Sequence, residues 1–476
     1  MDYAGNGDQL GDLAGIMRQR ARLWGVGRRL LHRWEGISSW RVRCYRSNVL
    51  SKRFGLVLAC AAAMWLFWAL GTKAQSPGET ASLAIDHPAI QYDTRPIDDR
   101  VTRLARDLAS GKVNIKPGPE GYLRSLLQAL DVNPDSQALV FSKTSFQAAR
   151  IDPRNPRALY FNDDVEVGFV RGSNLLEVAA LDPKQGVIFY SVDIASNPPQ
   201  FDRRDACLQC HLSPGTLGIS GLLIASSYTD ASGMPAFRGG QRITDHRTPL
   251  EDRWGGWYVT GTHEGMRHLG NAVGHDSAHP ELLDMRDSQD LTSLAKKFDA
   301  SGYLGGASDI VALMTLEHQT RMVNLMIRTG WEARIADPAG KVQLDQDIES
   351  LVTYMLFADE ASLHGQVQGV STFSKTFPER GPRDSQGRSL RDFDLRRRLF
   401  RYPLSYMIYS EAFDGMPENV RTQVYRRLYD VLTSRDTSDK FKRLSAEDRR
   451  AVLEILRDTK PGLPAYFRGE TAGIER

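Results

Sequence analysis

Two cysteines and a histidine in the middle of the chain constrain the protein more than any other feature. The stretch Cys207–His211 consists of Cys, Leu, Gln, Cys and His in that order. The two-residue spacer places both sulfur atoms on neighbouring turns of a short helix, and the histidine follows at once. Such a group is typical of half a zinc site, of a dithiol redox pair, or of a point where a porphyrin is attached.

The remaining cysteines help to separate these alternatives. The chain has four cysteines in all, and the other two, Cys44 and Cys60, lie near the N-terminus. A closed zinc site needs four ligands, and no second cysteine pair follows Cys210. A thioredoxin-like pair lies near a βαβ unit, and the pattern predicts none here. The motif therefore predicts one covalent haem c, with thioethers from Cys207 and Cys210 and with His211 as the proximal iron ligand.

The N-terminal region predicts export. Residues 1–53 carry eleven Lys and Arg against four Asp and Glu, and residues 54–70 form a run of seventeen uncharged residues. We interpret 1–53 as a basic cytoplasmic tail or extended leader, and 54–74 as a signal peptide or a retained membrane anchor. Either alternative places the rest of the chain on the periplasmic side of a bacterial cytoplasmic membrane, where haem is attached to c-type proteins.

The charge of the exported part bears on its partners. Residues 75–476 contain 49 Lys and Arg against 54 Asp and Glu, a formal charge near −5. This balance argues against a nucleic-acid partner. We expect a redox partner protein instead, with residues 54–70 as a membrane tether if they are not cleaved.

Hydrophobic patterning predicts an α+β fold. Short apolar runs between turn clusters are typical of antiparallel strands, and longer segments with helical spacing follow from about residue 307. We therefore expect an antiparallel β-rich N-terminal half around the haem motif, followed by a mainly α-helical C-terminal half. The predicted regions are a linker plus a β-rich region at 75–200, a haem-attachment region at 201–290 and a helical region at 291–476.

The individual elements follow from the same patterns. Strands are predicted at 138–141, 157–161, 166–170, 175–180, 186–192, 218–228 and 254–261. Helices are predicted at 101–109, 122–130, 310–328, 346–363, 392–402, 404–412, 417–432 and 446–459. Ser308 or Asp309 is expected to cap the first long helix, and Ser445 with Asp448 has the pattern of a capping box.

The sixth ligand of the iron decides between electron transfer and ligand chemistry. His318 is the first candidate for a distal ligand, because it shares an apolar helical face with Met314 and Met322 at spacings of four. The alternative is a core histidine whose neighbouring methionines provide packing. His246 has no local context that distinguishes it from a surface residue.

Two polar segments are further candidates. In the segment 262–271, His263 and His268 are suited to iron ligation or to acid–base chemistry, and Arg267 to a haem propionate or an anionic substrate. The alternative is a polar surface loop. Lys143, in the segment Phe141–Gln147, is a candidate for a polar pocket wall near the haem, and the alternative is a turn after a strand.

At Cys207–His211 the chain resembles c-type cytochromes. Segments such as 141–147, 156–164, 254–263 and 316–320 are similar to those of large exported bacterial proteins with a single Cys-x-x-Cys-His motif. The resemblance implies covalent haem attachment and export, but no particular activity. The rest of the chain does not resemble the small helical cytochrome c domain.

Three functions remain open from the sequence. The first is electron transfer, the second is a haem-dependent redox reaction with residues 262–271 as the pocket, and the third is a non-catalytic haem-based sensor or binding protein in the periplasm. The length of the chain favours more than simple electron carriage. If the protein is an enzyme, we expect an oxidoreductase.

Overall fold

The computed structural model describes residues 83–118, 120–236, 238, 240–276, 278–336 and 341–469. The predicted basic tail at 1–53 and the predicted signal or anchor at 54–74 lie outside the described residues. Among the helices that are described, none is long and apolar enough to cross a membrane.

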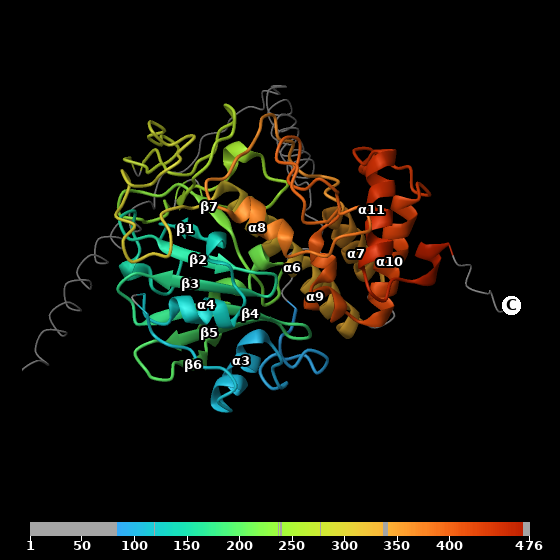
Figure 1. Cartoon of the computed structure of the whole chain (residues 1–476), viewed down its shortest axis with the longest axis horizontal. Coiled ribbons are helices and arrows are strands. Elements are labelled where there is room, and N and C mark those ends of the chain that lie inside the picture. The colour runs from blue at the N-terminus through green and yellow to red at the C-terminus, as the bar shows by residue number, and fades with distance from the viewer. Residues whose placement is uncertain are drawn as a thin grey trace, which may run out of the picture. The chain divides into compact units, whose positions relative to one another are not determined.

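A seven-stranded antiparallel sheet organises the N-terminal half, with the strand order β6-β5-β4-β3-β2-β1-β9 (Figure 1). Consecutive strands from β1 to β6 pair with their neighbours, so this part is the meander that the turn clusters predict. A separate two-stranded sheet joins β7 and β8. The strands are β1 (Ala138–Val140), β2 (Arg157–Phe161), β3 (Val165–Val170), β4 (Leu175–Asp182), β5 (Gly186–Asp193), β6 (Gln200–Arg203), β7 (Ala225–Ser227), β8 (Gln241–Ile243) and β9 (Trp257–Tyr258).

Helices dominate the C-terminal half, so the predicted α+β fold class is confirmed. Figure 1 shows them grouped on one side of the sheet half, with α10 and α11 farthest from the strands. The helices are α3 (Arg100–Ala109), α4 (Leu123–Ala129), α5 (Leu208–His211), α6 (Ile310–Ile335), α7 (Lys341–Met355), α8 (Phe373–Glu379), α9 (Glu411–Asp414), α10 (Glu418–Leu432) and α11 (Ala446–Thr459).

The long helix α6 joins the two halves. Of its 26 residues, 21 are buried, because the sheet packs on one side of it and α7 and α9 pack on the others. A helix that is buried around its whole circumference belongs to the core rather than to the surface. The Asp309 carboxylate caps it by accepting from the backbone N–H of Val311 at 2.8 Å, which confirms one of the two predicted caps.

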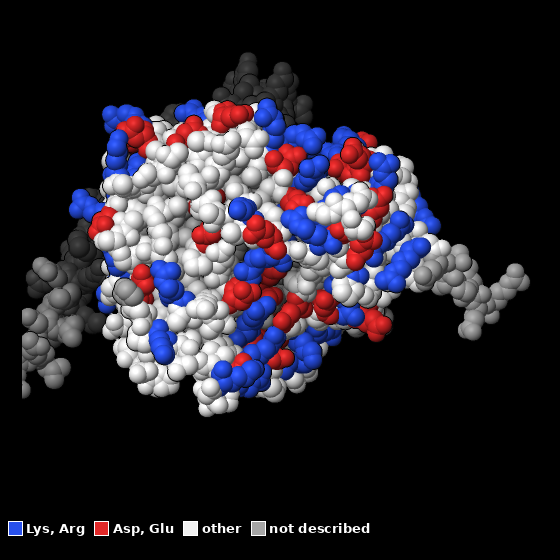
Figure 2. Space-filling view, in the orientation of Figure 1, with Lys and Arg blue, Asp and Glu red and all other residues white. Residues whose placement is uncertain are grey.

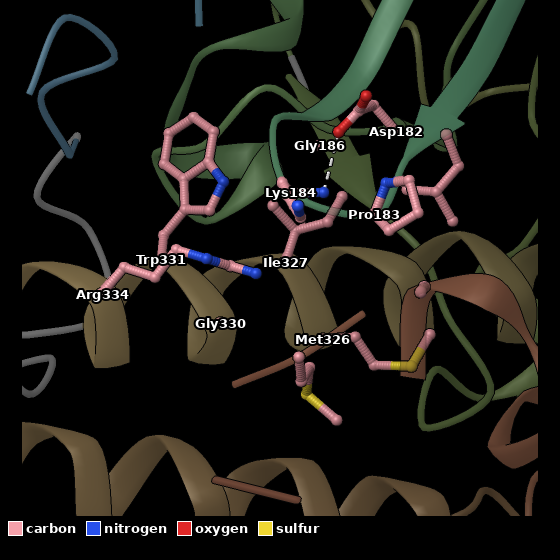
Figure 3. Close-up of a pocket in the computed structure, with 12 residues that line it drawn as sticks. Asp182, Pro183, Lys184, Gly186, Met326, Ile327, Gly330, Trp331 and Arg334 are labelled. Carbon is pink, nitrogen blue, oxygen red and sulfur yellow. Dashed lines mark hydrogen bonds between the residues drawn. The ribbon is translucent and has the colours of Figure 1, made fainter. Parts of the chain in front are cut away.

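The two faces of the sheet have different neighbours. The Tyr190 hydroxyl donates to the Asp99 carboxylate at the start of α3 over 2.6 Å, so α3 covers one face. On the other face, the β4–β5 turn lies against α6, where Gly186 has too little room for a Cβ beside Ile327. Figure 3 shows this turn, with the Lys184 N–H donating to Asp182 above the helix surface formed by Ile327 and Trp331.

Several predicted elements differ from the structure. The predicted helix at 392–402 is wrong: the Asp394 carboxylate accepts from the backbone N–H groups of Arg396 and Arg397, and this local bonding replaces helical bonding. The predicted strands at 218–228 and 254–261 shorten to β7 and β9. The segment 404–412 divides into a 3-10 turn and α9, because Ser410 caps α9.

The other long helices follow the prediction more closely. α7 ends at Met355, earlier than predicted, because Phe357 has a positive φ of 52°. The predicted capping box of Ser445 and Asp448 at the start of α11 is confirmed. The sequence patterns did not predict α8, β6 or β8.

Candidate functional site

The cysteine–histidine motif lies on a single short turn of helix between β6 and β7. A 3-10 turn, Asp205–Cys207, leads into α5, which ends at His211. Cys207 is half-buried and Cys210 is exposed, and no disulfide joins them. Both thiols are therefore free, and they lie three residues apart, with Cys207 at the end of the 3-10 turn and Cys210 in α5.

His211 has one ring nitrogen fixed and the other unengaged. Its Nδ1 lies 2.8 Å from the Gly221 carbonyl oxygen, so Nδ1 carries the proton and donates it. No hydrogen bond to Nε2 is formed by any residue in the described ranges, and its lone pair is available. Metal-ligating histidines share this arrangement, in which a backbone carbonyl sets the tautomer and the ring orientation. Burial lowers the pKa of His211, which favours the neutral, ligating form.

Two elements hold this imidazole in place. The ring of Phe189, on β5, lies with its centroid 4.6 Å from that of His211. From α6, the Asn324 side chain accepts from the Leu222 N–H and donates to the Leu222 carbonyl, each over 2.8 Å. Because Leu222 follows Gly221 directly, the central helix fixes the carbonyl that orients His211.

The sheet beneath the motif carries an ion pair. The cross-strand register places Gly168, Glu177 and Ser191 in one row of that face, and Arg157 pairs with Glu177 over 2.6 Å. The guanidinium lies over Gly168, where a Cβ would come within 2.8 Å of it. Burial raises the pKa of the Cys207 thiol, and the nearby Glu177 carboxylate raises it further. The ion pair therefore lies within electrostatic reach of the motif.

The segment 141–147 connects to this ion pair. The Ser145 hydroxyl and the Gln147 amide both donate to the Glu177 carboxylate. The segment thus forms part of the polar wall beside the motif. Lys143 itself bonds through its backbone N–H to the Gly233 carbonyl at 2.8 Å, and its charge acts on Asp230 rather than on the motif.

Buried polar atoms without partners collect along the same network. They are Oε1 of Glu166, Nε of Arg157 and Oε1 of Gln147. Glu166 is partly exposed as a whole residue, but this oxygen is buried, and burial raises the pKa of the carboxyl to about 7. Unpaired buried polar atoms in one place are typical of a site that takes up water or a ligand group.

Exposed apolar side chains flank the motif as well. Phe146 is 55 % exposed, and it lies between the two residues that bond Glu177. Ile243 is 37 % exposed and lies against Gly215, four residues after His211. This apolar surface lies beside two free thiols and an imidazole nitrogen without a partner. Such a surface suits contact with the edge of a porphyrin better than contact with water.

His318 lies in the core, on the predicted face with Met314 and Met322. Its Nδ1 is 2.8 Å from Nδ1 of His246, and its Nε2 is 2.8 Å from the Ser405 hydroxyl. Both ring nitrogens are engaged, so a bond to iron would require one of these hydrogen bonds to break. That His318 is the distal ligand therefore stays a prediction, and the alternative, a satisfied core histidine, accounts for all of its contacts.

His246 was interpreted from the sequence as a surface residue, and this interpretation is wrong. It is buried, stacks on Tyr354 with ring centroids 3.9 Å apart, and lies 3.9 Å from the Asp359 carboxylate. No local pattern predicts this, because its partners come from segments more than 70 residues away. Burial lowers the pKa of both His246 and His318.

His263 and His268 are buried side by side, whereas Arg267 between them is exposed. Their ring centroids are 5.0 Å apart, and burial lowers the pKa of His268 to about 3. Nδ1 of His268 accepts from the Gly270 N–H, so the ring proton lies on Nε2. A bond from Nε2 of His268 to a metal would therefore require loss of that proton.

His263 differs from its neighbour because neither of its ring nitrogens has a hydrogen-bond partner. The nearest carboxylate, that of Asp290, is 3.6 Å away. The described contacts of this pair include Trp254, Gly270, Gln289 and Asp290, and none of them is with the motif. Over the described ranges, no cluster of three or more His, Cys, Asp or Glu side chains is arranged to hold a metal ion.

Comparison with known proteins gives no relative. No protein-family profile, no curated protein and no solved structure matches this chain.

Proposed function

We propose that this chain is an exported c-type haem protein that takes part in electron transfer or in a haem-dependent redox reaction. Cys207 and Cys210 would form thioethers to one haem, and His211 would be the proximal ligand of its iron. The bound haem would supply a centre that exchanges one electron at a time.

One observation carries the proposal. His211 donates from Nδ1 to the Gly221 carbonyl over 2.8 Å and leaves Nε2 without a partner, directly after two cysteines that form no disulfide. A closed zinc site needs four ligands, which the described residues do not group together, and a dithiol redox pair does not require the histidine to be oriented in this way. A proximal haem ligand does require it, because the second nitrogen must point steadily at the iron.

The chain's own residues have distinct roles in this proposal. Asn324 and Gly221 hold the imidazole, and Phe189 covers one side of it. The Arg157–Glu177 pair sets the local charge beside the attachment point. These groups orient the ligand and tune the charge around it, as the groups around a metal ligand do in other proteins.

A haem-stained denaturing gel of protein from a strain that matures c-type cytochromes tests the proposal. We expect stain at the mass of the chain and the absorption of a haem bound through two thioethers. A Cys207→Ala, Cys210→Ala variant should lose the stain, whereas a Cys44→Ala, Cys60→Ala variant should keep it. Stain that persists without Cys207 and Cys210, or a wild-type chain without any stain, would contradict the proposal.

Carbon monoxide distinguishes electron transfer from the functions that need an open position on the iron. A reduced protein whose spectrum does not change under carbon monoxide has a firmly held sixth ligand, as electron carriers do. A spectrum that shifts indicates an open position, which suits substrate chemistry or ligand sensing. Export is tested separately by a phosphatase fused after residue 469, which we expect to be active on the periplasmic side.

A further inference from the structure

A wide groove opens in the helical half, apart from the cysteine–histidine motif. It lies between the segment 393–403 and the beginning of α11, and Leu356 and Phe357, which directly follow α7, also line it. Its volume is about 1120 Å³, which exceeds the range of pockets that enclose a single small ligand. The groove therefore has room for an extended ligand.

Seven arginines line this groove, and three of them are paired with carboxylates. Arg388 pairs with Glu454 over 2.8 Å, Arg397 with Asp394 over 3.2 Å, and Arg398 with Asp448. These ion pairs hold the two walls together, because two of them reach from the segment 388–398 to α11. Because a carboxylate neutralises each of these three arginines, the ion pairs offer little positive charge to a ligand.

The other four arginines have no carboxylate partner within the described part of the chain. We name them the groove arginines: Arg396, Arg401, Arg443 and Arg450. Three of them are free of any side-chain hydrogen bond there, and Arg443 donates only to the Glu360 carbonyl and the Ser362 hydroxyl. All four are exposed, and they occur on both walls. Guanidinium groups in such positions are suited to fork-like bonding of carboxylate or phosphate.

The acidic residues of the groove distinguish between kinds of anion. Glu447 is exposed and has no cationic partner in the described ranges, and the paired carboxylates lie close by. A dense polyphosphate or a charged lipid surface would bring its negative groups against these carboxylates. A peptide spaces its carboxylates apart and offers backbone N–H donors to the acids of the groove. The aromatic side chains of Phe393 and Tyr402 also suit peptide side chains.

We propose that this groove binds an extended acidic peptide segment of a partner protein, through its groove arginines. The segment would place its carboxylates against guanidinium groups on both walls. This site is independent of haem attachment, so neither proposal depends on the other.

Binding of a fluorescein-labelled peptide that alternates Glu and Ser over about ten residues tests the site. We expect the full-length protein to raise the anisotropy of this peptide and not that of a Gln–Ser control. The affinity should fall as salt rises to about 0.5 M, because salt screens exposed charges. An Arg396→Gln, Arg450→Gln variant should bind about tenfold more weakly.

Matched variants separate the site from general charge effects. Arg154→Gln removes an exposed arginine far along the chain from the groove, and it should leave the affinity unchanged. Arg396→Lys, Arg450→Lys keeps the charge but loses the fork, and it should weaken binding less than the Gln pair does. Circular dichroism checks that each variant is folded. If the variant with two Gln substitutions does not fold, the variant with two Lys substitutions serves as the test.

Three results would overturn the proposal. The first is equal affinity of the wild-type and groove variants for the acidic peptide. The second is no binding of the peptide at low salt. The third is displacement of the peptide by tripolyphosphate or by anionic vesicles at lower concentrations than by the unlabelled peptide, because the groove would then prefer dense phosphate.

Discussion

At the scale of single residues, the orientation of the motif depends on buried polar groups around it. Glu166 and Arg157 lie on the sheet face beneath it with unpaired atoms, and His211 is held by one carbonyl. In the core, His246 and His318 form a bonded pair that ends on Ser405. Each of these groups can be removed singly, so its effect can be measured.

The Glu166→Gln change tests the cost of a buried carboxylate. The pKa of Glu166 is raised from 4.5 to about 7, so the folded state holds its proton more tightly than the unfolded chain does. Its contribution to stability is complete below pH 4.5 and is lost as the pH rises through 7. We compare the free energy of unfolding of the variant with that of wild type at each pH. The difference should favour the variant by about 2–3 kcal/mol more at pH 8 than at pH 5. Urea denaturation at both pH values measures this, with exposed Glu418→Gln as the control, and a gain that does not depend on pH would contradict it.

The His318→Ala change tests the buried histidine pair. The substitution leaves a cavity and removes hydrogen bonds to His246 and Ser405, so we expect a loss of about 3 kcal/mol in the free energy of unfolding. His246→Ala should cost a similar amount, and the two losses should not add, because the residues are in contact. If His318 is also the distal ligand, its change alone alters the haem spectrum. Additive losses would show that the two rings act independently.

At the scale of elements, α6 connects the sheet, the motif and the helical half. Polar side chains along its length bond to segments on every side. Gln319 donates to the carbonyl of Asn162, Asn324 holds the loop after the motif, and Arg328 donates to the Leu217 carbonyl. A purely apolar helix could slide or rotate in the core, whereas these bonds fix its register.

Asn324→Ala should separate the motif from its support. The change leaves both backbone groups of Leu222 without partners, so we expect a loss of about 2 kcal/mol in stability. It should also broaden or shift the absorption bands of the proposed haem, because the Gly221 carbonyl no longer holds His211 firmly. Asn419→Ala, on the exposed side of α10, is the control. Loss of stability with an unchanged spectrum would show that the motif is oriented without α6.

At the scale of the whole molecule, residues from the sheet to α11 share one hydrophobic core. Figure 2 shows a different division at the surface: charges of both signs alternate over the helical half and near α3, and a wide area over the sheet half carries few. Because α6 lies within that core and both halves pack on it, neither half has a complete core of its own.

We therefore expect the part of the chain from 83 to 469 to unfold in one cooperative transition. Of the eight tryptophans, three lie in this part of the chain, Trp254 and Trp257 near the sheet and Trp331 in α6, and the change in their fluorescence on unfolding reports on both halves. Far-UV circular dichroism reports mainly on the helices. The two signals should give the same urea midpoint. Two separate midpoints would show that the sheet half and the helical half fold independently.

The sequence by itself determined the features that depend on near neighbours along the chain. Short apolar runs between turn clusters predicted the strands from β1 to β5, because most of the side chains in these strands lie in the core. The spacing in Cys207–His211 placed two thiols and an imidazole on one helical turn. The capping box at Ser445 and the cap at Asp309 are also local, and both were confirmed.

Only the tertiary structure decided which distant groups meet. His246 and Ser405 reach His318 across more than 70 residues, and the Gly221 carbonyl and Asn324 meet at the motif, so no local pattern reports these contacts. The segment 392–402 has helical spacing, yet the Asp394 side chain turned it into a loop that lines the groove. Periodicity records which residues are buried, and only packing determines what each buried polar group is bonded to.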